Sequence, residues 1–229
     1  YRRWQSDVGY AWWLMESYWV AIAERYSEQY NIFLAYPNIT VLPSSIAAAP
    51  IECIELDFNN STPRALLEQC RFIRQYNIET MYFSDKPSWG FRYGFFRTFR
   101  AKNIVVHDHT PGIRDTPQGI IKWAKTTLHK LLLITPTAMF ATSPFVCARH
   151  IDVNCMPAKK CFIVNNGIPE GVTEEPANIR ECYAIKSTHL VMVMTGRANF
   201  YKGIDFVLKC MHHNLKHRRF KSEVHHLIR

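Results

Sequence analysis

The chain has 229 residues, 48% of them hydrophobic and 21% charged, a composition typical of globular proteins that excludes a disordered chain. Its net charge of +9 suits nucleic acid, an anionic membrane or a phosphorylated small molecule, and does not choose among them. The seven cysteines include no CxxC pair, which argues against a zinc site or a disulfide framework and predicts a reducing, cytoplasmic location.

The hydrophobic pattern alternates between helices and short strands along the first 166 residues. The spacing predicts helices over 10–29, 62–76, 88–98, 119–133 and 143–150, and strands over 32–35, 51–56, 79–83, 103–106, 138–141 and 160–164. This alternation predicts βαβ units and a parallel sheet. We therefore expect an α/β protein whose first domain, residues 1–166, is doubly wound and Rossmann-like.

A polar stretch over 167–187 predicts a linker to a second part, residues 188–229. There, Val191–Met194 predicts a buried strand, and apolar positions from Ile204 to Met211 predict a helix. One strand and one helix bury too little surface for a core of their own. We therefore expect only the first βα part of a second Rossmann-like domain, in a chain truncated within that domain.

The predicted strand and helix of the second part flank a loop that contains Gly196, Arg197 and Lys202. Ligands bind at the carboxyl edge of such sheets, and a helix N-terminus there favours anions. Arg can hold a phosphate with two parallel hydrogen bonds, while Lys acts as a point charge. The loop is typical of a diphosphate site that needs no metal; a surface loop with two solvated cations is the alternative.

His107, Asp108 and His109 follow the strand predicted over 103–106. An imidazole there can hydrogen-bond a sugar hydroxyl or position an acceptor, and a structural role or a metal are the alternatives. If the strand continues, alternation points His107 and His109 one way and Asp108 the other. The sequence does not decide which histidine faces a ligand, and no third metal ligand at useful spacing is evident.

Three other positions each have a functional and a structural interpretation. Gly9 allows close backbone approach to a ligand or a tight turn, and Asn166 touches substrate or shapes the turn between domains. Ser143 binds substrate or caps the helix that follows it.

The helix predicted over 119–133 is basic and amphipathic, with Lys122 and Trp123 beside a leucine-rich face. Such helices can lie on anionic membranes, so peripheral contact at the inner face of the membrane is one interpretation. Packing of the apolar face on the sheet is the other. Aromatic and basic residues are not interleaved as in a nucleic-acid-binding module, and we expect no nucleic-acid partner.

Several of these elements together resemble the retaining glycosyltransferases of family 4, which have the GT-B fold. The similarity lies in the order Asn166-Gly167-Ile168, linker, apolar strand, Gly196-Arg197 and Lys202-Gly203. Upstream, Val105-Val106-His107-Asp108 resembles the family's HD element, and Thr142-Ser143 its serine before the domain-closing helix. Gly9 stands where the family has a glycine-rich first βα loop, although Tyr10 replaces the second glycine.

The resemblance implies an enzyme of polysaccharide biosynthesis that moves a sugar, with retention, from a nucleoside-diphosphate sugar to a saccharide or lipid-linked acceptor. It implies catalytic roles for His109 and His107 and no cofactor or metal. It further implies donor diphosphate binding by Arg197, Lys202 and Gly196, and substrate binding by Gly9, Asp108, Ser143 and Asn166. The family's acidic E-x7-E element has no counterpart here, so the alternative is an inactive fragment that binds a sugar nucleotide or glycan.

Overall fold

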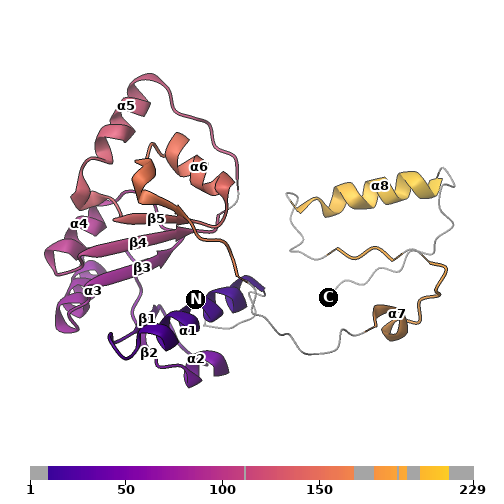
Figure 1. Ribbon diagram of the computed structural model, residues 1–229, viewed down its shortest axis with the longest axis horizontal. Coiled ribbons are helices and arrows are strands. Elements are labelled where there is room, and N and C mark those ends of the chain that lie inside the picture. The colour runs from indigo at the N-terminus through magenta and orange to yellow at the C-terminus, as the bar shows by residue number, and fades with distance from the viewer. Residues whose placement is uncertain (1–9, 111, 168–177, 190, 195–201, 217–229) are drawn as a thin grey trace. The chain divides into compact units, whose positions relative to one another are not determined.

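The computed structural model describes residues 10–110, 112–167, 178–189, 191–194 and 202–216. The chain divides into two compact units, unit 1 over residues 1–170 and unit 2 over residues 171–229 (Figure 1). The division falls inside the stretch 167–187 that the sequence predicts to be a linker. The functional roles expected of the two parts stay predictions.

Unit 1 alternates strands and helices in the predicted order. Its strands are β1 (Phe33–Tyr36), β2 (Glu52–Glu55), β3 (Thr80–Ser84), β4 (Asn103–Asp108), β5 (Ala138–Ala141) and β6 (Cys161–Ile163). Its helices are α1 (Tyr10–Tyr26), α2 (Ser44–Ala48), α3 (Pro63–Gln75), α4 (Phe91–Thr98), α5 (Gly119–Leu128) and α6 (Pro144–Asp152). Short 3-10 helices cover Leu132–Ile134 and Ala158–Lys160. The sequence pattern did not indicate α2.

All the strand pairs in the described residues are parallel, as the βαβ rhythm predicts. They form two sheets: β1 pairs with β2, and β3, β4, β5 and β6 lie side by side in chain order. The register places Ser84 beside His107, and His107 beside Phe140. The carboxyl ends of β3, β4 and β5 therefore meet at one edge, where Figure 1 shows the three arrowheads together.

The core lies between the four-stranded sheet and helices α3 and α4. Ile73 of α3 and Phe96 of α4 pack with Ile104 and Val106, the buried even-numbered positions of β4. Because side chains alternate across a strand, the odd-numbered positions of β4 face the opposite side of the sheet. His107 is one of them, and its ring meets Tyr18 of α1 edge-on at 5.9 Å.

Two helices of unit 1 start where the sequence places a capping residue before proline. The Thr62 hydroxyl accepts a hydrogen bond from the Ala65 amide at the start of α3. The Ser143 hydroxyl does the same for the Val146 amide at the start of α6. Each cap satisfies a backbone N–H that the first helical turn leaves unpaired, and the following proline fits the first turn without needing a donor.

Two predicted elements differ in the structure. The helix expected over 119–133 ends at Leu128. Its apolar side chains are exposed apart from the half-buried Leu128, so the helix does not bury an apolar face on the sheet as one interpretation held. The strand expected at Val191–Met194 is absent, and Met192–Met194 are exposed. A strand needs a neighbour for its backbone N–H and C=O groups, and the described part of unit 2 holds no other strand.

The described part of unit 2 contains helices α7 (Ile179–Cys182) and α8 (Ile204–Lys216). The helix predicted from Ile204 is therefore confirmed. Across the described ranges of both units, every helix is too short or too polar to cross a lipid bilayer.

Candidate functional site

The carboxyl edge of the four-stranded sheet gathers three side chains, Tyr82 of β3, His107 of β4 and His109 just after it, which we call the imidazole cluster. His107 has no exposed surface, and its Nε2 lies 3.2 Å from the Val164 carbonyl oxygen. Because a carbonyl only accepts, Nε2 carries the ring proton. Nδ1 then accepts a hydrogen bond from the Tyr82 hydroxyl.

Electrostatics keep His107 in this neutral, hydrogen-bonded state. Burial lowers its pKa to about 4, and the neighbouring His109 adds to the shift. Burial likewise raises the pKa of Tyr82, which therefore stays a hydrogen-bond donor. With both nitrogens of His107 occupied, its ring has no donor or acceptor left for a ligand, and it acts as a fixed wall of the cluster.

His109 differs from His107 in having neither ring nitrogen hydrogen-bonded to any residue that the structure describes, although both nitrogens are buried. Its Nδ1 lies 3.7 Å from the Asp85 carboxylate, beyond hydrogen-bond distance. The Asp85 carboxylate instead accepts the His109 backbone N–H at 2.7 Å. Asp85 thereby fixes the backbone of His109 and leaves the imidazole without a hydrogen bond to the carboxylate.

Asp108 points to the opposite face, as alternation along β4 predicts. Its buried carboxylate accepts a hydrogen bond from Nη2 of Arg149 at 2.7 Å and one from the Thr110 amide at 2.8 Å. His150 Nε2 lies 3.1 Å away. Burial alone would raise the pKa of Asp108, but the contacts with His150 and Thr110 outweigh it and hold the pKa well below its usual range. The Asp108 carboxylate therefore contacts two residues of α6, Arg149 and His150.

Arg149 also fixes the loop that follows β4. Its guanidinium donates to the Thr110 carbonyl and to the Gly112 carbonyl, each at 2.9 Å. Gly112 has a φ of +129°, a backbone conformation that glycine takes without a steric cost. Arg149 and Asp108 together thus hold the loop that carries His109.

Two further candidates have well-defined surroundings. The Ser143 hydroxyl is occupied as the cap of α6. Asn166 follows β6 and is exposed, while the carbonyl of its neighbour Asn165 accepts a hydrogen bond from Tyr18. Tyr18 therefore ties α1 to the segment that leaves β6, beside the imidazole cluster.

The candidates for donor binding fall mostly outside the residues that the structure describes. Gly9, Gly196 and Arg197 lie among the undescribed residues. Lys202 is described, is exposed, and stands two residues before α8 in unit 2. Its position near a helix N-terminus matches the sequence-based expectation, and its role as a phosphate ligand stays a prediction.

No group of three or more His, Cys, Asp or Glu side chains that could hold a metal ion occurs within the described ranges. The alternation of side chains along β4 explains why His107, Asp108 and His109 do not form such a group. The two histidines lie on one face, and the Asp108 carboxylate on the other contacts Arg149. The three side chains thus do not converge on one point.

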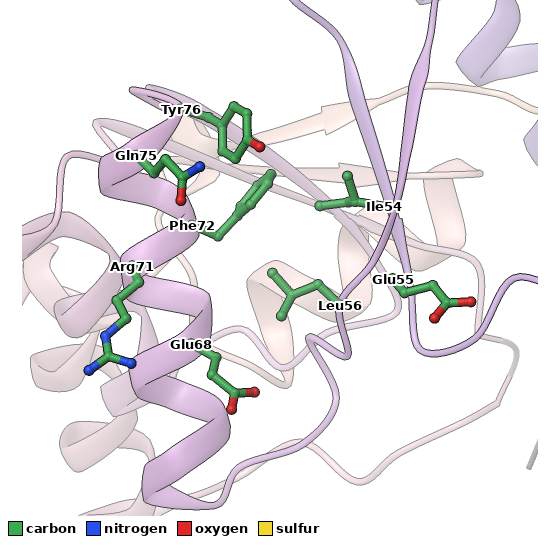
Figure 2. A pocket seen from close by; sticks show the side chains of 8 residues that line it. All are labelled: Ile54, Glu55, Leu56, Glu68, Arg71, Phe72, Gln75 and Tyr76. Carbon is green, nitrogen blue, oxygen red and sulfur yellow. The ribbon is translucent and has the colours of Figure 1, made fainter.

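An open hollow of about 310 Å³ lies elsewhere in unit 1, between α3 and β2 (Figure 2). Its lining residues are Ile54, Glu55, Leu56, Glu68, Arg71, Phe72, Gln75 and Tyr76. Figure 2 shows Phe72 and Tyr76 facing Ile54 and Leu56 across the hollow. It shares no residue with the imidazole cluster, and its apolar walls are those of a partly open packing seam between a helix and a strand.

Sequence reasoning did not single out Asp85, Tyr82 or Arg149. Asp85 was within reach, because it follows β3 just as His109 follows β4, and the ends of parallel strands share an edge. Tyr82 and Arg149 gave no such signal. A tyrosine in a strand and an arginine in a helix are ordinary residues until the register and the packing of α6 place them.

The parallel sheets, with helices that connect successive strands, define a Rossmann-like α/β fold consistent with the GT-B type. The solved structure of a glycosyltransferase from Rickettsia africae ESF-5 is similar, with a TM-score of 0.64 and 15% sequence identity. The similarity covers 95% of this chain and 56% of that one, so this chain spans little more than half of the neighbour's length. No protein-family model and no curated protein matches the sequence.

Proposed function

We propose that this chain belongs to a glycosyltransferase that moves a sugar from a nucleoside-diphosphate sugar to a saccharide or lipid-linked acceptor. We further propose that it is a retaining enzyme of family 4. The fold similarity to a glycosyltransferase supports the general activity. The Asn166-Gly167 and Gly196–Gly203 elements support the family and the retaining course.

The observation that carries the proposal is the state of His109. Both of its ring nitrogens are buried at the ligand-binding edge of the sheet, and neither is hydrogen-bonded to a described residue. A buried polar group without a partner costs about 1–3 kcal/mol, so its presence favours a ligand that completes its hydrogen bonds. A sugar hydroxyl both donates and accepts, and it fits either ring nitrogen.

In the proposed reaction the bond between the anomeric carbon and the diphosphate oxygen breaks, and the acceptor oxygen forms the new bond to that carbon. The acceptor hydroxyl gives its proton to a phosphate oxygen of the departing nucleoside diphosphate. Negative charge builds up on the leaving group, and Arg197 and Lys202 would stabilise it. His109 would hold a sugar hydroxyl in place, within a cluster whose geometry His107 and Tyr82 fix.

The test is transfer and release of nucleoside diphosphate by the full-length protein, measured over a panel of nucleoside-diphosphate sugars with and without acceptors. We expect His109→Ala to lower kcat/KM about 5- to 150-fold, which corresponds to about 1–3 kcal/mol of lost hydrogen bonding. His212→Ala, at an exposed histidine of α8, is the matched control and should leave kcat/KM unchanged.

Three results would argue against the proposal. Full activity of a folded His109→Ala variant would remove the imidazole from the reaction. Tight binding of a sugar nucleotide by the wild-type protein without any transfer would instead identify a sugar-nucleotide-binding protein. Activity that chelation of divalent metals abolishes would contradict the proposed role of fixed cations in place of a metal.

A further inference from the structure

Helix α5 presents large apolar side chains to solvent. Ile120 is 84% exposed, Trp123 69% and Ile121 63%. Ile113, in the loop before the helix, is 90% exposed. Isolated exposed apolar residues are common on protein surfaces, but four large ones within eleven positions of the chain are characteristic of a surface that binds a partner.

The orientation of α5 is fixed by a contact on its other side. The Lys125 ammonium donates to the Val153 carbonyl at the end of α6, at 3.0 Å. With 3.6 residues per turn, Ile120 and Trp123 lie on the side of the helix opposite Lys125. Figure 1 shows α5 projecting outward from the four-stranded sheet. The contact with α6 therefore turns the Ile120 and Trp123 side chains away from the rest of unit 1.

The charge of this segment is strongly positive. Residues 112–130 carry four cations, Arg114, Lys122, Lys125 and Lys130, against the single acid Asp115. Lys122 is exposed. With 3.6 residues per turn it lies about 100° around the helix from Trp123, so its long side chain flanks the apolar side chains and does not lie among them. An apolar protein partner would not need this excess of cations, whereas an anionic lipid surface attracts cations and accepts apolar side chains at the same depth.

We propose that α5 is a membrane-docking helix, which inserts Ile120 and Trp123 between the headgroups of an anionic bilayer, while the exposed side chains of Arg114, in the loop before the helix, and of Lys122, at its flank, extend to the lipid phosphates. Tryptophan and isoleucine beside lysine are typical of helices that lie in the membrane interface. The surface is short, so the binding is reversible and depends on both the apolar and the charged residues. This membrane-docking proposal does not depend on the proposed glycosyltransferase function, because no sugar nucleotide takes part in lipid binding.

The test is co-sedimentation of the full-length protein with lipid vesicles. We expect binding to vesicles of equimolar phosphatidylcholine and phosphatidylglycerol, and at least tenfold weaker binding to phosphatidylcholine alone. Raising the salt from about 0.1 M to about 1 M, which shortens the screening length from about 10 Å to about 3 Å, should release most of the protein.

Variants locate the binding surface. Ile120→Ser with Trp123→Ser should reduce binding at least tenfold, and Lys122→Glu should reduce it several-fold. The matched controls are Leu67→Ser with Phe91→Ser, at exposed apolar positions of α3 and α4, and Lys159→Glu, at an exposed lysine of a 3-10 helix. All the variants change exposed side chains, so they should unfold at the same urea concentration as the wild type.

Three outcomes would overturn the proposal: no binding of the wild type to anionic vesicles, equal loss in the α5 variants and the controls, or equal binding to neutral vesicles. Sedimentation velocity gives an independent check. If the wild type is a dimer that Ile120→Ser with Trp123→Ser converts to a monomer without any vesicle binding, the surface is an interface between two copies of the chain.

Discussion

The imidazole rings of His107 and His109 lie with their centroids 4.1 Å apart, although only His107 has its ring nitrogens hydrogen-bonded within the described structure. The two side chains leave the same face of β4, and the intervening Asp108 leaves the other. His107 is therefore a fixed part of the scaffold, whereas both ring nitrogens of His109 are buried without a hydrogen bond to a described residue. This difference has measurable consequences for stability and for activity.

The first prediction concerns the loss of folding stability at acid pH. Unfolded His107 titrates near its ordinary pKa of 6.5, and folded His107 near about 4. Between these values the unfolded state binds more protons, so stability rises with pH and is lost as the pH falls through this window. The loss attributable to His107 is up to about 3 kcal/mol, since one pKa unit corresponds to about 1.4 kcal/mol.

Urea unfolding at a series of pH values measures this effect. His107→Gln should be less stable at pH 7 but should show a flatter pH dependence between about pH 6.5 and about pH 4. His212→Gln should keep the wild-type slope. An unchanged slope in His107→Gln would mean that folding does not lower the pKa of this histidine. Asp108, whose pKa is lowered, loses its contribution only as the pH falls below about 3.8.

The second prediction concerns the buried pair of Arg149 and Asp108. Arg149→Met leaves a buried carboxylate without its cation, and removal of one partner from such a pair costs about 3–5 kcal/mol of unfolding free energy. Arg64→Met is the matched control, because the Arg64–Glu68 pair is exposed and contributes less than about 0.5 kcal/mol. Equal urea midpoints for the two variants would show that the buried pair does not hold the loop after β4.

The third prediction separates the two interpretations of Ser143. As the cap of α6 its hydroxyl satisfies the Val146 amide, so Ser143→Ala should cost about 1 kcal/mol of unfolding free energy. Ser143→Asp also caps a helix and should restore the stability. If Ser143 only caps, neither variant changes KM for the sugar nucleotide or the acceptor. A raised KM in both variants would support substrate binding in addition.

The fourth prediction concerns the donor diphosphate. Lys202→Glu in the full-length protein should weaken use of the donor about 10- to 150-fold, since a hydrogen bond to a charged group contributes about 1.5–3 kcal/mol. Lys186→Glu changes an exposed lysine of the same unit and should have little effect. Unchanged kcat/KM for Lys202→Glu would remove this loop from the donor site.

Sequence reasoning located the strands of unit 1 to within a residue or two, because each is a short apolar run bounded by turn or polar residues. It also predicted that His107 and His109 share a face, since alternation follows from strand geometry alone. It was wrong about Val191–Met194, because the described part of unit 2 holds no other strand with which this apolar run could form a ladder. It also placed the end of the helix that starts at Gly119 too late.

The sequence by itself determined the order of elements, the capped starts of α3 and α6, and the arrival of His107, Asp108 and His109 at the end of β4, because these depend on local spacing. The tertiary structure decided which histidine has its ring nitrogens hydrogen-bonded within unit 1. His107 is occupied by Tyr82 and Val164, residues 25 and 57 positions away. Hydrogen bonds across such separations arise from strand register and packing, which local patterns do not encode.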